Sequence, residues 1–296
     1  MYDLKIMGGL VVDGTGAPGR IMDVGIVGDR IVAVGTLDES AREEIDASGR
    51  IVTPGFVDIH THYDGQATWD QEMAPSAWHG VTTVVMGNCG VGFAPAAPER
   101  QDWLIGLMEG VEDIPGSALA EGMTLDWESF PKYLTALEKL DRTIDVAAQV
   151  PHGAVRAYVM GDRGAANEAP TDDDIAHMAS IVEEGLTAGA VGFSTSRTIL
   201  HKSVEGELVP GTTATKEELL GIGDALKRAG HGVFELASDL HPDWNEFGWM
   251  GDLSRNTGAA VAFTALESPI KGLSFAQQLA EMRTQNEAGA QIVAQI

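Results

Sequence analysis

The sequence predicts an α/β fold: a (β/α)8 barrel of the TIM type, incomplete in this chain, preceded by a small β unit. From residue 51 onward, apolar strand segments alternate with helical segments, a pattern that favours a parallel sheet or barrel. With 296 residues, 44% of them hydrophobic, the chain is long enough to bury a substantial core. The candidate barrel strands are residues 51–59, 81–87, 144–150, 189–194, 232–237, 259–266 and 291–296.

Short strands separated by turns occupy the first fifty residues. Gly28 and Asp29 join two apolar segments and predict a β-hairpin. We therefore expect an N-terminal β segment over residues 1–52 and a barrel domain over residues 53–296. The candidate strands of the N-terminal segment are residues 4–7, 10–12, 23–27 and 31–34.

Helix start and stop signals between the later strands support the barrel. Thr171 is a predicted N-cap ahead of apolar residues at helical spacing. Thr215 with Glu218, and Ser274 with Gln277, have the spacing of capping boxes, in which each side chain bonds the backbone of the other residue. Glycines are expected to end the same helices, at positions 189, 230 and 289.

The seventh candidate strand runs to the last residue, Ile296. A barrel of this type closes with eight strands, and an open sheet exposes a strand edge. We therefore expect that the sequence is a fragment, or that its fold departs from the full barrel.

Charge and composition narrow the function classes. The chain has 19 Lys and Arg residues against 44 Asp and Glu, a net charge of -25, which disfavours nucleic acid and anionic membranes as partners. It has no signal-peptide pattern and no apolar run of about 18 residues. Its single cysteine excludes an intrachain disulfide and fits a reducing compartment. We expect a cytoplasmic protein and leave its oligomeric state open.

A histidine pair follows the first barrel strand, and a cysteine follows the second. His60 and His62 are two residues apart, so in an extended segment their side chains lie on one face and can converge on one ion. Catalytic residues of this fold lie at the carboxyl ends of the strands, where Cys89 also lies. Imidazole and thiolate are zinc ligands, so these residues are candidate metal ligands. The histidines also fit a hydrogen-bonded pair at a strand end, and Cys89 also fits a small buried hydrophobe.

The segments around these residues resemble the amidohydrolase superfamily and, within it, the D-aminoacylase or N-acyl-D-amino-acid deacylase group. The resemblance is carried by GFVDIHTHYDGQATWD and GVTTVVMGNCGVGFAP, and it implies an N-terminal segment that forms a β-sandwich with a C-terminal one. It also implies that Cys89 takes the place of the carboxylated lysine of other subtypes, since strand four has no lysine. The similar stretches are residues 55–70, 80–95, 111–134, 150–161 and 188–197.

The sequence departs from the pattern of that family. The resemblance implies metal-ligating histidines at the ends of strands five and six, but residues 232–239 and 261–267 contain none. The expected catalytic aspartate would lie beyond Ile296, so no catalytic residue is assigned within the chain. Carboxylates also bind divalent ions, and a carboxylate-rich site would favour manganese. The candidate substitutes are Glu235, Asp239 and Glu267.

Further polar residues are candidates near the same end of the barrel. Asp58 shares the face of His60 and is a candidate partner for an imidazole nitrogen. His152 follows strand three and is a candidate contact for substrate, although it also fits a loop hydrogen bond. Arg197 and His201 follow strand four and are candidates to bind a substrate carboxylate, although Arg197 also fits a loop anchor.

The features and the resemblance together imply a metal-dependent hydrolase of a non-peptide C–N bond. Zinc, or alternatively manganese or another divalent metal, would polarise the acyl carbonyl and activate water, and an aspartate would pass a proton to the leaving amine. The implied substrate is a small N-acyl-D-amino acid. The alternatives are another amide or cyclic-amide hydrolase of the superfamily and a non-catalytic barrel with a degenerate metal site. We expect little activity from the 296-residue form itself.

Overall fold

The computed structural model describes residues 1–112, 114–267 and 272–296. The chain divides into two compact units, Met1–Phe56 and Val57–Ile296. The domain boundary expected after residue 52 stays a prediction.

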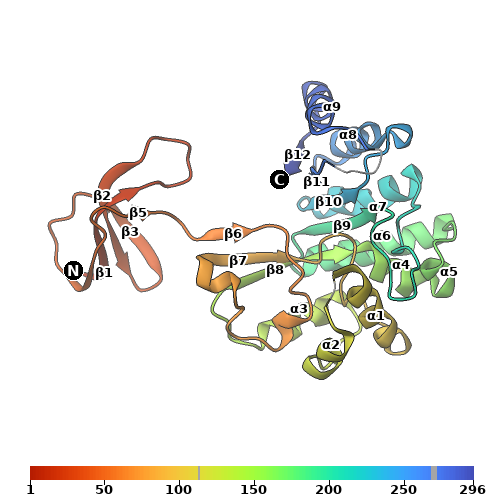
Figure 1. Cartoon of the computed structure of the whole chain (residues 1–296), viewed down its shortest axis with the longest axis horizontal. Helices are drawn as coiled ribbons and strands as arrows, with labels where there is room; N and C mark the ends of the chain where they lie inside the picture. Colours follow the sequence, from red (N-terminus) through yellow and green to blue (C-terminus); the bar gives the residue numbers. More distant parts are fainter. Residues whose placement is uncertain (113, 268–271) are drawn as a thin grey trace. The chain divides into compact units, whose positions relative to one another are not determined.

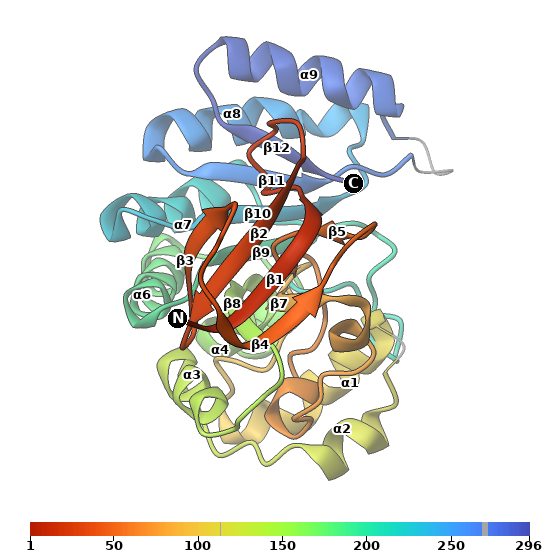
Figure 2. The same cartoon turned by 90° about the vertical axis from the view of Figure 1, so that its left-hand side faces the viewer.

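The first unit is a five-stranded sheet with the order β3-β2-β1-β4, in which β5 also pairs with β1 (Figure 2). The hairpin predicted at Gly28 is confirmed: β2 and β3 pair antiparallel, and Gly28 has a left-handed φ of 58°. The strand β4 was missed because its sequence, AREEID, is charged and lacks apolar alternation. The strands are β1 (Tyr2–Val11), β2 (Arg20–Val27), β3 (Arg30–Gly35), β4 (Ala41–Asp46) and β5 (Ile51–Val52).

The continuous strand predicted over residues 51–59 is wrong. The chain forms two short strands there, β5 and β6 (Phe56–Asp58), which belong to different sheets. Pro54 lies between them, and proline cannot donate a ladder hydrogen bond, so the apolar run is interrupted. Residues that look like one strand therefore end one sheet and begin the next.

The second unit contains a seven-stranded sheet in which the strands follow the chain in order from β6 to β12 (Figure 1). Neighbouring strands pair in parallel from β7 to β12. The predicted α/β barrel fold is confirmed: the second unit is a curled parallel half-barrel, and the N-terminal sheet is separate from it. The remaining strands are β7 (Val81–Met86), β8 (Asp145–Pro151), β9 (Gly192–Arg197), β10 (Val233–Ser238), β11 (Ala260–Thr264) and β12 (Ile292–Gln295).

Helices connect the strands, as parallel pairing requires. The two predicted capping boxes differ in outcome. Ser274 and Gln277 form both hydrogen bonds. Thr215 accepts the N–H of Glu218, but the carboxylate of Glu218 bonds His152 instead of the backbone of Thr215. Thr171 caps its helix as predicted. The α-helices are α1 (Gln101–Glu112), α2 (Gly116–Gly122), α3 (Phe130–Glu138), α4 (His152–Met160), α5 (Asp162–Ala165), α6 (Asp172–Ala188), α7 (Lys216–Ala229), α8 (Glu246–Thr257) and α9 (Phe275–Glu287).

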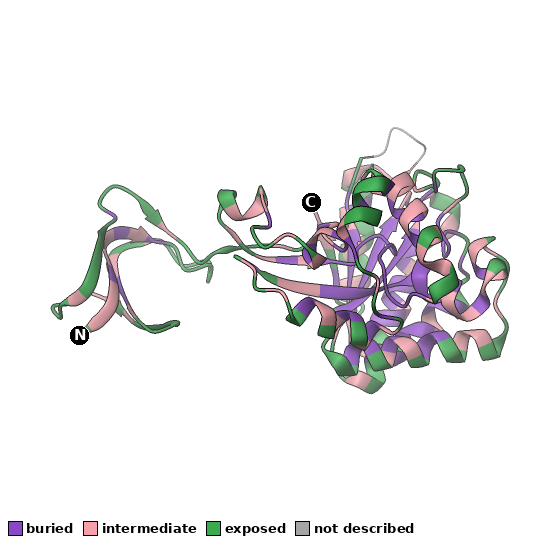
Figure 3. Ribbon diagram, turned by 90° about the horizontal axis from the view of Figure 1, so that it is seen from below, coloured by how far each residue is buried: buried purple, intermediate pink, exposed green. Residues whose placement is uncertain are grey.

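The core of the second unit lies between the sheet and its helices, where Figure 3 shows the buried residues concentrated. Phe193 of β9 and Phe234 of β10 are fully buried, with ring centroids 5.0 Å apart, and Trp249 of α8 packs on Phe234 at 5.8 Å. Aromatic pairs at these separations stabilise beyond their buried area. These contacts hold β9, β10 and α8 together. None of the described helices is long and apolar enough to cross a membrane.

Candidate metal centre

The structure brings together the three residues that the sequence singled out as metal ligands. His60 and His62 follow β6, and Cys89 follows β7, so all three lie at the carboxyl ends of neighbouring strands. One ligand atom from each lies within 4.8 Å of the others. Both chain segments deliver nitrogen or sulfur donors, the set that zinc prefers.

The imidazole of His60 is held from both sides. Its Nδ1 lies 2.9 Å from Oε1 of Gln295, at the end of β12, and its Nε2 lies 3.2 Å from Sγ of Cys89. An amide oxygen can only accept, so Nδ1 carries the proton and Nε2 presents its lone pair toward the thiol. Asp58, the predicted partner of an imidazole nitrogen, instead accepts the backbone N–H of His60 at 3.3 Å.

The imidazole of His62 lies beside a carboxylate. Oε1 of Glu112, at the end of α1, is 3.3 Å from Nδ1 of His62, within ion-pair distance but without hydrogen-bond geometry. Metal-ligating histidines commonly have a carboxylate or carbonyl at the second ring nitrogen. The buried Nδ1 of His62 therefore has a candidate acceptor, and its other nitrogen is the one left for a metal.

Burial sets the protonation of these ligands in the metal-free chain. It lowers the pKa of His62 to about 3, and the nearby charges of His60 and His201 act in the same direction. Burial also raises the pKa of the Cys89 thiol, and neighbouring carboxyl groups, led by Glu235, raise it further. The His62 ring is thus neutral, the form that ligates a metal, whereas Cys89 must release a proton when a metal binds.

The candidate ligands face a cavity of about 280 Å³ at the carboxyl ends of the strands. A site with three protein ligands and an adjoining space keeps a coordination position open, as catalytic zinc sites do. The donor types, their spacing and this open side fit a divalent metal. The lining residues are His60, His62, Cys89, Val111, Glu112, Thr198, Leu200, His201, Ala237, Ser238, Asp239, Thr264 and Leu266.

Of the three predicted substrate contacts, only His201 lines this cavity among the described residues. Its Nδ1 bonds Oγ of Ser196 at 2.9 Å, and burial lowers the pKa of His201 to about 4, partly opposed by the charge of Asp239. Arg197 is engaged elsewhere: its Nε donates to Glu246 at 2.7 Å, and its guanidinium lies 5.6 Å from the ring centre of Trp244. This pairing fits the loop-anchor interpretation of Arg197, and a contact of Arg197 with substrate stays a prediction.

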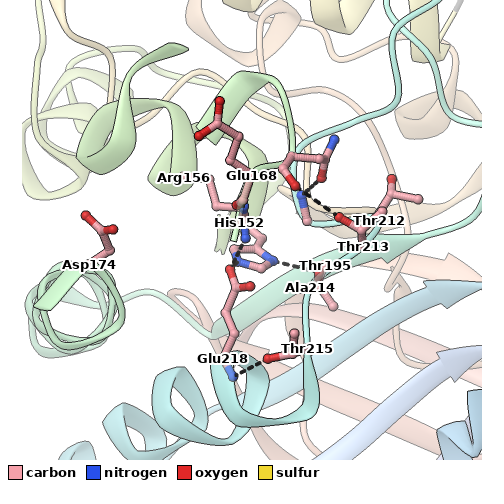
Figure 4. A network of polar contacts seen from close by, with 12 residues as sticks. His152, Arg156, Glu168, Asp174, Thr195, Thr212, Thr213, Ala214, Thr215 and Glu218 are labelled. Atoms are coloured by element: carbon pink, nitrogen blue, oxygen red, sulfur yellow. Dashed lines mark hydrogen bonds and ion pairs between the residues drawn. The ribbon is translucent and has the colours of Figure 1, made fainter. Parts of the chain in front are cut away.

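His152 is fully buried in a polar network, which Figure 4 shows, and it is not among the residues that line the cavity. Its Nδ1 lies 2.8 Å from Oγ1 of Thr195, and its Nε2 lies 3.1 Å from Oε1 of Glu218, which also pairs with Arg156. His152 begins α4 directly after β8, so the chain has already turned away from the strand end. Both ring nitrogens are therefore used within the protein.

The carboxylates considered as substitute ligands occupy different places. Asp239 lines the cavity and accepts from Thr198 and from the N–H of Ile199 at 2.9 Å. Glu267 is exposed and does not line the cavity. Glu235 is 1% exposed, and its Oε2 accepts the backbone N–H of Cys89 at 3.0 Å. None of these carboxylates belongs to the cluster of close ligand atoms found among the described residues.

Gln295 and Glu112 were not predicted from the sequence. Gln295 could have been found, because it lies at the carboxyl end of a candidate strand, where this fold concentrates its functional residues. Glu112 ends a helix whose position over the cavity no sequence pattern indicates.

The chain matches a known protein family and known sequences. The sequence profile of the amidohydrolase family matches residues 43–291. The chain is 36% identical over 230 residues to a D-aminoacylase of Alcaligenes xylosoxydans xylosoxydans, covering 77% of this chain and 43% of that protein. It is also 36% identical over 225 residues to an N-acyl-D-glutamate deacylase of the same organism, covering 74% and 40%.

Solved structures give the same picture. A crystal structure of D-aminoacylase superposes with a TM-score of 0.80 at 31% identity, covering 99% of this chain and 58% of that one. The N-acyl-D-glutamate deacylase of Bordetella bronchiseptica, in complex with zinc and a phosphonate inhibitor, superposes with a TM-score of 0.74 at 30% identity and the same coverage. The chain thus spans about half the length of these relatives. By its matched profile, its identity to the deacylases and its fold, the chain belongs to the amidohydrolase family.

Proposed function

We propose that this chain forms the metal-binding part of a hydrolase that cleaves the amide bond of N-acyl-D-amino acids, giving a carboxylate and an amino acid. The observation that carries the proposal is the cluster of His60, His62 and Cys89 facing a cavity at the carboxyl ends of the barrel strands. The identity to D-aminoacylase and to N-acyl-D-glutamate deacylase supports the substrate class. Zinc is the proposed metal, because the donors are two imidazoles and one thiol.

The chain's own residues supply binding and orientation. When bound, a divalent metal acts as a Lewis acid toward the acyl carbonyl and activates water. Gln295 fixes the tautomer of His60, so this imidazole is oriented before a metal arrives, and Glu112 lies beside His62. His201 lines the cavity and is the proposed contact for the substrate.

The proposal is tested by the metal content of the chain and by hydrolysis with an intact hydrolase that contains it. The purified chain should bind a transition metal, and the intact hydrolase should release free amine from some member of a panel of N-acyl-D- and N-acyl-L-amino acids in a chelator-sensitive way. His60→Ala and Cys89→Ser should lower metal content, while the exposed His177→Ala should not. A chain with less than about a tenth of an equivalent of metal contradicts the proposal, because a catalytic metal site must be filled to act.

A binding role without catalysis is the second candidate. It is favoured by the ends of β10 and β11, where the residues lining the cavity are Ala237, Ser238, Asp239, Thr264 and Leu266 and include no histidine. Metal binding without turnover across the whole panel would favour this role.

A further inference from the structure

Glu235 reaches Cys89 across the barrel, from a strand 146 residues later in the sequence. Its Oε2 accepts the backbone N–H of Cys89 at 3.0 Å, and its side chain is among the most buried polar groups of the chain. Glu235 does not line the metal cavity, and it is not part of the close ligand cluster among the described residues. Its contact with the site therefore passes through the backbone of Cys89.

The backbone of Cys89 needs such a contact. Its φ is 55°, in the left-handed region that a residue with a side chain seldom adopts. Such a conformation costs about 1–3 kcal/mol and persists only where the surroundings enforce it. The adjacent turn residues Gly87 and Gly90 are also left-handed, but as glycines they carry no penalty. Cys89 is thus the strained residue of its turn.

The neighbours of Cys89 in the turn are held by their own contacts, which do not involve the N–H of Cys89. Asn88 donates its side-chain N–H to the carbonyls of Thr61, at 3.1 Å, and Val85, at 2.9 Å. The N–H of Gly90 donates to the hydroxyl of Ser194 at 3.0 Å. The N–H of Cys89 is left to Glu235.

A buried carboxyl group that accepts only one amide N–H leaves its second oxygen without a partner. Oε1 of Glu235 is buried and has no hydrogen-bond partner among the described residues, and leaving such an atom unpaired costs about 1–3 kcal/mol. An apolar residue at this place in the sheet would avoid that cost but would leave the N–H of Cys89 unpaired. We interpret the buried carboxyl group as a means of orienting Cys89. In this orientation, Sγ of Cys89 lies 3.2 Å from Nε2 of His60.

We propose that Glu235 is a positioning residue for the metal centre: its hydrogen bond fixes the left-handed backbone of Cys89 and so aims the thiolate at the metal shared with His60 and His62. This inference rests on the metal site of the proposed function. Residues that orient metal ligands change metal affinity by about 10–100-fold when they are removed.

The test uses cobalt(II) as a spectroscopic probe of the whole chain. Binding is followed by the thiolate-to-cobalt charge-transfer absorption, and affinity is measured by competition with a chelator. Glu235→Met keeps the side-chain volume without an acceptor, and Glu235→Ala is a second variant of the same kind. Both should bind cobalt about 10–100-fold more weakly, with a weaker charge-transfer band. Glu235→Gln, which keeps an acceptor oxygen, should stay within about threefold of the wild type on the same scale.

Glu218→Gln is the matched control, because Glu218 is an equally buried carboxylate that does not line the cavity. It should lose stability yet keep the wild-type cobalt spectrum and affinity. The inference is overturned if Glu235→Met or Glu235→Ala binds cobalt like the wild type, if Glu235→Gln fails as they do, or if Glu218→Gln weakens binding equally. If the wild type shows no thiolate-to-cobalt band, the result contradicts the metal site of the proposed function, and not only the role of Glu235.

Discussion

Replacing Glu218 with glutamine should destabilise the chain strongly, because Glu218 is the only carboxylate that the described residues place against the buried guanidinium of Arg156. The side chains of both residues are 1% exposed, and the imidazole of His152 in the same network is fully buried. Removing one partner of a buried ion pair costs about 3–5 kcal/mol, since it leaves an uncompensated charge in a poorly solvated place. Glu218→Gln keeps the size of the side chain, so the loss would come from the charge.

Urea unfolding followed by circular dichroism measures this effect. Glu217→Gln is the control, because Glu217 is the neighbouring residue of the same helical turn and is exposed. It should change the free energy of unfolding by less than about 0.5 kcal/mol, as surface substitutions usually do. The double variant Arg156→Met, Glu218→Gln should recover part of the loss, because it removes the stranded charge as well. A Glu218→Gln chain within 1 kcal/mol of the Glu217→Gln chain would refute the reasoning.

The same network predicts the pH dependence of the loss. Burial alone would raise the pKa of Glu218, but the hydrogen bond and charge of His152, together with the charge of Arg156, outweigh it and hold the pKa below its ordinary value. A lowered carboxyl pKa stabilises the folded chain above the unfolded value of about 4.3, and this stabilisation disappears as the pH falls through the folded value. The difference between wild type and Glu218→Gln should therefore be full at pH 7 and shrink in acid.

Three further predictions concern the metal centre. Burial raises the pKa of Glu235 to about 8, so the metal-free chain should lose stability as the pH rises from about 5 to 8, by up to about 1.4 kcal/mol per pH unit. In urea titrations at several pH values, Glu235→Gln should remove that slope. Parallel pH profiles of the two chains would contradict this prediction. Zinc binding at pH 7 should release about one proton from the thiol of Cys89, and zinc binding by Cys89→Ser should release none. The number of protons is measured by calorimetry in buffers of different ionisation enthalpy. Equal release by both chains would exclude the thiol as the source of the proton. Gln295→Ala should weaken zinc binding about 10–100-fold, because the ring of His60 loses its hydrogen-bond partner. The control Gln291→Ala, at an exposed position, should bind zinc like the wild type. Equal zinc affinities of Gln295→Ala and the wild type would show that the ring needs no such support.

The sequence was most informative where a single local rule decides the outcome. The apolar strands after residue 80 and the caps at Thr171 and Ser274 are local signals, and the structure reproduces them. The histidine pair and Cys89 were found because parallel strands of a barrel present their carboxyl ends to one face.

The sequence misled where a distant partner decides. Glu218 has the spacing of a capping-box residue, but the buried Arg156 and His152 compete for its carboxylate, and only the folded chain shows that they lie there. Arg197 follows a strand, and its ion pair with Glu246 of another segment is likewise visible only in the folded chain. The partnership of Glu235 with the N–H of Cys89 spans 146 residues, and no local pattern reports it.

The hydrogen bond between His60 and Gln295 has a consequence for the sheet as a whole. β6 and β12 stand at opposite ends of the strand order, yet these side chains meet at 2.9 Å, so the sheet is curled until its first and last strands come within reach of each other. The imidazole of His60 therefore bridges the gap between the first and last strands. One ring nitrogen contacts the thiol of Cys89, which follows the second strand, and the other contacts the amide of Gln295 on the last strand. A substitution that changes the spacing between β6 and β12 would therefore change the position of His60 in the candidate metal centre.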